Sequence, residues 1–107
     1  MFCRIAAREI PAEVVFETDA VLAFRDLAPK APTHVLVVPK RHFADIGELG
    51  GHPESAAALV AAVGAVAAEL GLSSYRTVLN TGPEAGQTVF HVHAHVLGGR
   101  GLSWPPG

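Results

Sequence analysis

The sequence predicts a single α+β domain, in which an antiparallel sheet of about five strands carries one long helix and short helices on one face. Short apolar runs rich in Val, Leu and Phe are separated by turns that suit hairpins, which predicts antiparallel pairing. One longer stretch places apolar residues at helical spacing. The chain has 107 residues, half of them apolar, which is the size of one small domain with one core. We therefore expect one domain over residues 1–107.

The five predicted strands follow the apolar runs in chain order. Residues 13–17 and 21–25 flank Thr18 and Asp19, which favours a hairpin. Residues 34–39 read HVLVVP, a β-branched run typical of a buried strand. Residues 76–80 and 88–97 give two more strands, and the glycine-rich loop between them reads TGPEAGQ.

The long helix is predicted between Pro53 and Gly71. Proline is tolerated in the first turn of a helix, and glycine commonly follows the last turn. The apolar stripe between them advances by four, three and four residues and consists of Leu59, Val63, Val66 and Leu70. Helical spacing within residues 2–6 and 43–49 predicts two further short helices.

Composition and charge argue against several classes of partner. The formal net charge is −2 and there is no basic run, so we expect neither nucleic acid nor an anionic membrane as a partner. The longest apolar tract, residues 56–68, is about 13 residues long, which is too short to span a bilayer. The single cysteine, Cys3, allows no internal disulfide, and the first residues lack the apolar segment of a secretory signal. We therefore expect a cytoplasmic protein.

Three of the six histidines occupy alternate positions within the stretch FHVHAHVLGGR, residues 90–100. Successive side chains of a strand point to opposite faces. The side chains expected to face the core beneath the helix are those of Phe90, Val92, Ala94 and Val96. On the open face, His91, His93 and His95 would then form a polar line, with about 6.6 Å between neighbours.

Three interpretations fit this line of histidines: a solvated strand face, a metal site, or nucleophilic catalysis at phosphorus by imidazole. A closed metal site needs four ligands, and no cysteine or nearby carboxylate pattern completes one, so we expect no metal and no cofactor. The loop just upstream, residues 84–88, offers backbone N–H groups, an amide and a hydroxyl that suit phosphate oxygens. The sequence therefore favours attack on phosphorus by a neutral histidine whose other ring nitrogen donates to a backbone carbonyl.

The segment HVHAHVL matches the pattern His-φ-His-φ-His-φ-φ, where φ is apolar, and resembles the signature of the histidine triad (HIT) superfamily of nucleotide hydrolases and transferases. Three longer blocks resemble its Hint branch, the histidine triad nucleotide-binding proteins, and read FRDLAPKAPTHVLVVPKRH, NTGPEAGQTVFHVHAHVLGGR and SWPPG. The resemblance covers residues 2–107. It implies a HIT-like fold and a homodimer whose two sheets join across the interface.

The resemblance also implies roles for four histidines. His93 would be the nucleophile that takes the nucleotidyl group, and His91 would orient it. His95 would contact the phosphate and protonate the departing amine, and His34 would lie close to the triad as a fourth site histidine. The residues alone favour a different interpretation of His34, a core histidine with satisfied hydrogen bonds. His42 and His52 are expected to be surface residues without a role.

Further positions match the nucleotide pocket of the family. Asp26 would accept hydrogen bonds from the ribose hydroxyls, although the residue by itself favours capping of the loop that follows. Phe24 and Leu27 would line the base pocket. The residues implied to hold the phosphate are Asn80, Gly86, Gln87 and Thr88. Trp104 would reach the active site of the partner subunit, or else fill a groove on its own subunit.

The activity that the resemblance implies is that of a purine nucleoside phosphoramidase. It would cleave the P–N bond of an adenosine 5′-monophosphoramidate through a nucleotidyl-histidine, without a metal, and release AMP and an amine. Two alternatives stay open. One is a dinucleoside polyphosphate hydrolase of the same superfamily, and the other is a nucleotide-binding regulatory protein with little catalysis.

Overall fold

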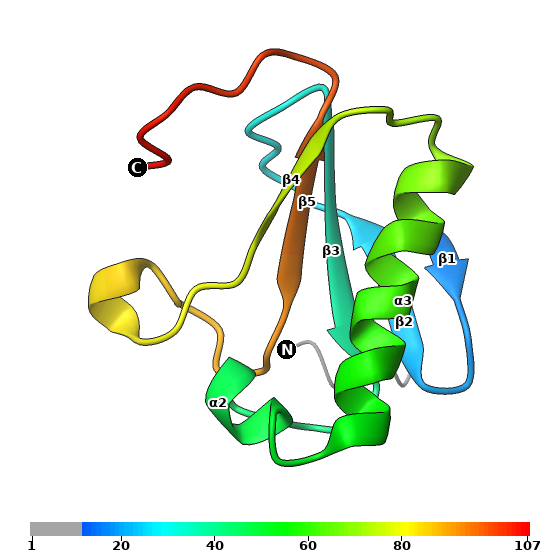
Figure 1. Cartoon of the computed structure of the whole chain (residues 1–107), viewed down its shortest axis with the longest axis vertical. Helices are drawn as coiled ribbons and strands as arrows, with labels where there is room; N and C mark the ends of the chain where they lie inside the picture. The colour runs from blue at the N-terminus through cyan, green and yellow to red at the C-terminus, as the bar shows by residue number, and fades with distance from the viewer. Residues whose placement is uncertain (1–11) are drawn as a thin grey trace.

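The computed structural model of the chain describes residues 12–107, and the predicted helix at residues 2–6 lies outside them. Five antiparallel strands form one sheet in the order β1-β2-β3-β5-β4. One long helix packs on this sheet, as Figure 1 shows, and a short helix lies at its N-terminal end. The predicted α+β class with one long helix and short helices is therefore confirmed.

The first three strands form a meander. β1 (Val14–Glu17) and β2 (Val21–Arg25) make the predicted hairpin, in which the Thr18 hydroxyl accepts from the N–H groups of Ala20 and Val21 at 3.2 and 3.1 Å. β3 (Thr33–Pro39) pairs with β2 along its length, from Val21 opposite Pro39 to Arg25 opposite Val35. From His34 to Pro39 every residue of β3 is buried, which explains the continuous apolar run.

The last two strands are shorter than expected. β4 covers Tyr75–Val78, and β5 covers Ala94–Gly98. The prediction of a strand over residues 88–97 is therefore wrong in its first half. β3 ends at Pro39, which has no N–H to offer, and β4 ends at Val78. Consequently no described strand flanks residues 88–93, although their alternating pattern is that of a strand.

The helices begin and end near the expected residues. α3 (Pro53–Glu69) has proline in its first turn, and Gly71 follows its end with a left-handed φ of 69°. Its buried residues are Leu59, Ala62, Val66 and Ala67, whereas Val63 and Leu70 are only partly buried. α2 (Ile46–Leu49) begins after Asp45, whose Oδ1 accepts from the N–H of Glu48 at 2.9 Å. None of the described helices is long and apolar enough to cross a membrane.

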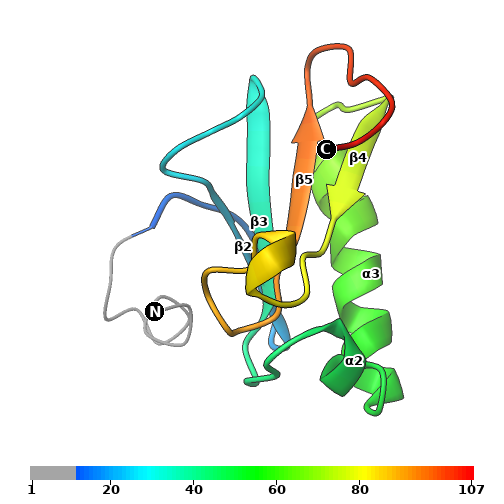
Figure 2. The ribbon, with the colours of Figure 1, turned by 90° about the vertical axis from the view of Figure 1, so that its left-hand side faces the viewer.

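Apolar side chains cover both faces of the sheet. The larger core lies between the sheet and α3 and includes Val35, Val37, Ala94 and Val96. On the opposite face a smaller cluster consists of Leu22, Phe24, Leu36 and Val38. Figure 2 shows α3 on one side of the sheet and the loop between β2 and β3 extending to the other. His34 and His95 lie on that second face, because His34 is two residues from Leu36 and His95 pairs with Leu36.

Candidate active site

One histidine of the triad lies in a strand, and the other two lie in irregular backbone. His95 belongs to β5, whereas His91 and His93 precede it in the irregular segment 88–93. Val92, Ala94 and Val96 are buried in the core as predicted, but Phe90 is 53% exposed, so its predicted core position is wrong. The predicted open line is also wrong for His91 and His93, which are buried. Since segment 88–93 leaves the sheet, strict alternation does not hold there.

His93 has a defined proton arrangement. Its Nδ1 lies 2.8 Å from the carbonyl oxygen of His91. A carbonyl can only accept a hydrogen bond, so Nδ1 of His93 carries the proton and the lone pair of the neutral ring is on Nε2. This is the arrangement that a histidine needs to attack an electrophile through Nε2.

His91 is anchored to the end of β3. Its Nε2 donates to the carbonyl of Pro39 at 2.7 Å, and its Nδ1 lies 3.2 Å from Nδ1 of His42. Burial lowers the pKa of His91, the bond to the Pro39 carbonyl partly opposes this, and the neighbouring rings of His42 and His93 lower the pKa further. The imidazole of His91 is therefore neutral at neutral pH.

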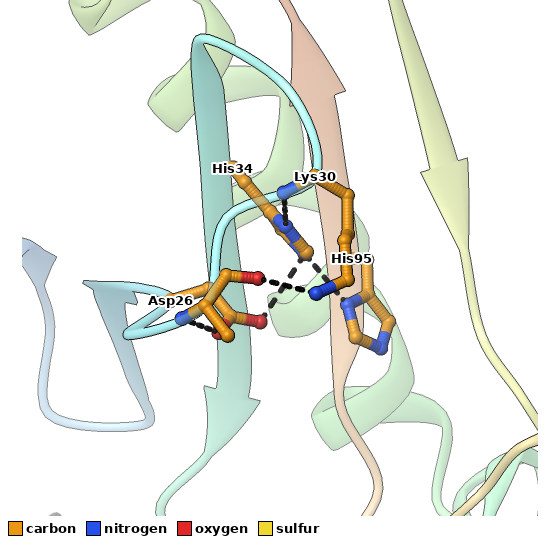
Figure 3. A network of polar contacts seen from close by, with 5 residues as sticks. Asp26, Lys30, His34 and His95 are labelled. Carbon is orange, nitrogen blue, oxygen red and sulfur yellow. Dashed lines mark hydrogen bonds and ion pairs between the residues drawn. The ribbon is translucent and has the colours of Figure 1, made fainter.

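His34, His95 and Asp26 form a network on the second face of the sheet, which Figure 3 shows. The backbone N–H of Lys30 donates to His34 Nδ1 at 3.0 Å, so the neutral His34 ring carries its proton on Nε2. That Nε2 lies 2.9 Å from His95 Nδ1 and 3.4 Å from an oxygen of Asp26. The expectation that His34 lies close to the triad is therefore met by a direct contact, and its burial also fits the core interpretation.

His95 faces the site through its Nε2, because His34 occupies its Nδ1. Burial is the main reason that the pKa of His95 falls to about 4, and the rings of His93 and His34 lower it further while Asp26 raises it. The pKa of His34 is also lowered, mainly by burial, and Asp26 opposes that shift. Both rings are therefore neutral near pH 7 before a substrate binds.

Acidification is expected to destabilise the fold through these histidines. An unfolded chain protonates histidine near 6.5, whereas folded His34, His91 and His95 resist protonation, His95 down to about 4. Their contribution to the free energy of unfolding is thus complete above about pH 6.5 and declines as the pH falls toward about 4. For partly buried His95 we expect a loss of about 1–2 kcal/mol after solvent screening. Urea unfolding between pH 7 and about 4.5 measures it.

A His95→Gln variant provides the control, because carboxylates also contribute to acid destabilisation. It should lose less stability than the wild type over the same pH interval. Equal pH dependence in the two proteins would show that His95 does not resist protonation in the fold.

Asp26 uses its two carboxylate oxygens differently. Oδ1 accepts from the N–H of Ala28 at 2.8 Å, which is the turn-capping role expected of an aspartate at this position. Oδ2 is the oxygen near His34. The two residues expected in the base pocket differ in exposure: Phe24 is buried in the smaller apolar cluster, and Leu27 is 96% exposed.

The residues expected at the phosphate lie around a single 3₁₀ turn, η1 (Pro83–Ala85). Gly86 follows it with a φ of 97°, and a Cβ there would come within 3.6 Å of Asn80 Nδ2. Thr88 is exposed, whereas the Gln87 side chain is buried and connects the loop both to itself and to Ala44, which precedes α2. Its Oε1 accepts from Gly82 N–H at 2.9 Å, and its Nε2 donates to the carbonyls of Ala44 and Val89 at 2.7 and 3.1 Å.

The tail presents Trp104 to the outside. The ring is 82% exposed, so within the described residues it does not fill a groove of its own subunit. Arg76 of β4 holds the tail by donating to the carbonyl of Ser103 at 2.8 Å. Tyr75, at the start of the same edge strand, is 41% exposed.

One group of side chains in the described part of the chain has metal-ligand geometry. The ligand atoms of Asp26, His34 and His95 all lie within 4.8 Å of one another. Two imidazoles and a carboxylate with an open fourth position form the donor set of some zinc sites. The sequence did not predict this group, because its members are far apart along the chain.

The contact of His42 with the triad is a feature that the sequence did not predict. His42 lies beyond β3, is exposed, and was expected to have no role. In the structure its ring stands edge-on to that of His91, with 4.9 Å between the ring centroids. No pattern in the residues around His42 indicates this contact.

Comparisons with known proteins identify the family of the chain. The model of the HIT domain matches residues 7–102. The chain belongs to the HIT family. A HIT-like protein of Synechococcus elongatus is 53% identical over the whole chain and 96% of its own length. The Arabidopsis thaliana protein named adenylylsulfatase HINT1 is 41% identical, and the match covers 100% of this chain and 76% of that protein.

Solved structures of HIT proteins superpose closely on this one. A crystal structure described as a HIT family hydrolase from Legionella pneumophila has a TM-score of 0.95 and 47% identity, covering 100% of this chain and 98% of that one. A histidine triad nucleotide-binding protein from Candida albicans has a TM-score of 0.85 and 30% identity, covering 97% and 81%. The fold of this HIT protein is therefore that of its family.

Proposed function

We propose that this HIT protein hydrolyses the P–N bond of purine nucleoside 5′-monophosphoramidates, such as those of adenosine, and releases AMP and an amine. The observation that carries the proposal is the proton arrangement of His93, whose Nδ1 donates to the His91 carbonyl and leaves the lone pair on Nε2. Similar proteins named as HIT hydrolases, a nucleotide-binding protein and an adenylylsulfatase support a nucleotidyl substrate.

In the first step, Nε2 of His93 attacks the α-phosphorus while the P–N bond breaks and its electron pair leaves with the amine. Negative charge on the bound phosphate and on Asp26 favours uptake of a proton from solvent at Nδ1 of His95, and this proton replaces the bond from His34. The Nε2 proton of the resulting imidazolium then passes to the departing nitrogen. In the second step, the neutral His95 ring accepts a proton from water, and the water oxygen displaces His93 from phosphorus. AMP leaves, and His93 regains its neutral form.

The remaining predicted residues bind the nucleotide in this proposal. Asp26 accepts from the ribose hydroxyls, and Phe24 and Leu27 contact the base. The phosphate lies against the turn around η1, held by Asn80, Gly86 and Thr88. Because the polar groups of the Gln87 side chain are bonded to the backbone of Gly82, Val89 and Ala44, the contribution of Gln87 to phosphate binding is to fix the shape of that turn.

We further propose that the protein is a homodimer whose sheets join at β4. An apolar cavity of about 350 Å³ lies among α2, α3 and β4, and Val60 on its rim is 72% exposed. A second copy would cover this apolar surface and bring exposed Trp104 to the site of the partner. Sedimentation equilibrium should give twice the chain mass of 11.1 kDa, and a monomer at micromolar concentration would refute this proposal.

A second candidate, divalent metal binding, is favoured by the group of Asp26, His34 and His95. In this case the ion would replace the contact between His34 and His95, and metal binding rather than covalent catalysis would be the main property of the site. It competes with the catalytic proposal, since a His95 ring ligated through Nδ1 cannot take the second proton that makes it an imidazolium acid.

A substrate panel on chelator-washed protein separates the candidates. We expect adenosine phosphoramidates to turn over at least about ten times faster than dinucleoside polyphosphates, in kcat/KM, with no added metal. Added zinc should slow the reaction. Faster turnover of the polyphosphates, no turnover of either class, or a requirement for zinc would each contradict the phosphoramidase proposal.

A further inference from the structure

His42 lies in the turn that connects β3 to α2, and its ring meets the triad from outside the sheet. Its Nδ1 is 3.2 Å from Nδ1 of His91. The adjacent Phe43 makes a second hydrogen bond to the segment that carries the triad: its carbonyl accepts from the N–H of Val92 at 2.7 Å. Segment 88–93 has no neighbouring strand among the described residues, so contacts of this kind hold it in place.

The direction of the bond between the two rings follows from the next bond along. The Pro39 carbonyl accepts from His91 Nε2, so that nitrogen carries the proton of the neutral ring and His91 Nδ1 carries its lone pair. An acceptor at His91 Nδ1 requires a donor at His42 Nδ1. His42 therefore donates, and the ring of His91 is held at both nitrogens, by the turn on one side and by the end of β3 on the other.

The orientation of residue 91 matters for the nucleophile. The backbone carbonyl of His91 accepts the Nδ1 proton of His93, and this bond keeps the lone pair of His93 on Nε2. Because His91 Nε2 is tied to Pro39, a rotation of the His91 ring would break that bond as well as the one to His42. Without the donor at His42, the His91 ring is held only by its bond to Pro39 among the bonds described above, and the orientation of the His91 carbonyl is less restricted.

We propose that His42 is a positioning residue for the nucleophile: its Nδ1–H fixes the tautomer and the orientation of His91, and His91 in turn presents its carbonyl to His93. This inference rests on the proposed role of His93 as nucleophile. His42 itself touches neither the substrate nor the reacting atoms in this arrangement.

Three substitutions test the donor specifically. His42→Phe keeps a ring of similar size without a donor, His42→Ala removes the ring, and His42→Asn can place its amide N–H near the position of Nδ1. We expect the Phe and Ala variants to lower kcat by about 10- to 100-fold, as is typical when a group that orients a reactive imidazole is lost. KM should change by less than about twofold, and His42→Asn should recover kcat to within about threefold of wild type.

The matched control is His52→Asn, since His52 lies against Phe43 but makes no described contact with the triad. It should keep wild-type kcat. Two results would overturn the proposal: wild-type kcat in His42→Phe, or a folded His42→Asn variant that is as slow as His42→Ala. Either result would show that the N–H donor of His42 does not determine kcat.

A spectroscopic measurement tests the proposal independently of activity. In ¹⁵N-labelled protein, long-range ¹H–¹⁵N spectra distinguish the two tautomers of each imidazole. Wild type should show His91 protonated at Nε2 and His93 protonated at Nδ1. His42→Phe should shift His91, and to a lesser extent His93, toward a mixture of tautomers.

Unchanged tautomers in His42→Phe would overturn the positioning role even if no substrate has been found. Conversely, mixed tautomers in a protein that cleaves no phosphoramidate would support the positioning role and reject the proposed function alone. The two failures are therefore distinguishable.

Discussion

Replacement of His93 by alanine is expected to lower kcat on an adenosine phosphoramidate by about 10⁴-fold or more, while AMP affinity stays within about threefold of wild type. The effect is large because the reaction would lose the only nitrogen to which the nucleotidyl group is transferred. His91 has both ring nitrogens committed, to Pro39 and His42, and so has His34, to Lys30 and His95. The Nε2 of neutral His95 faces the site but carries the proton of that ring, because Nδ1 accepts from His34.

His93→Gln controls for the volume that alanine would leave, because His93 is only 9% exposed. Glutamine keeps a polar side chain of similar length but has no nucleophilic nitrogen, so it should be as inactive as alanine. Thermal unfolding of both variants checks that they fold. If either folded variant retained more than about one hundredth of the wild-type kcat, another residue would be the nucleophile.

Rapid quenching followed by intact-mass measurement identifies the intermediate directly. Wild type should carry an adduct with the mass of the adenylyl group during turnover, and His93→Gln should carry none. An adduct that persists in the variant would place the covalent bond on a different side chain. Nucleotide binding without an adduct in wild type would favour the regulatory alternative.

The second large effect is expected on stability. Gln87→Leu should lower the free energy of unfolding by about 2–4 kcal/mol, because it removes three hydrogen bonds from a side chain that is 2% exposed. Leucine fills a similar volume but leaves the Gly82 N–H and the carbonyls of Ala44 and Val89 facing an apolar group. Urea unfolding measures the change, provided that the slope of the free energy of unfolding against urea concentration is the same in the variant and in wild type.

Glu84→Gln is the matched control in the same loop, since Glu84 is exposed and lies within η1. It should change stability by less than about 0.5 kcal/mol. If Gln87→Leu were equally mild, the three bonds would contribute little and the loop would be held by other contacts. KM for the phosphoramidate should rise in the leucine variant, because Gln87 shapes the turn proposed to bind the phosphate.

Local patterns predicted the elements of the fold for a simple physical reason: the apolar residues of a helix or strand lie on the face that is buried in the core, away from water. The spacing of Leu59 and Val66 therefore identified α3, and HVLVVP identified β3. Family membership also followed from the sequence, since HVHAHVL and the tail SWPPG are local motifs. The comparisons confirmed that assignment.

The same reasoning failed where the chain keeps a strand-like pattern outside the sheet. Phe90 alternates correctly with Val92, yet it is exposed because residues 88–93 have no strand beside them among the described residues. The ends of β3 and β4 decide this, and neither end is visible in the residues around Phe90.

By itself, the sequence determined the class of fold and the family, and it identified His91, His93 and His95 as the candidate triad. Only the tertiary structure decided how these residues are protonated and aimed. His34 meets His95 across 61 positions of the chain, and His42 meets His91 across 49. Such contacts depend on the pairing of β3 with β5 and on the path of two turns, which no local periodicity encodes. A hydrogen bond fixes a tautomer only when its partner is in place, and the fold supplies that partner.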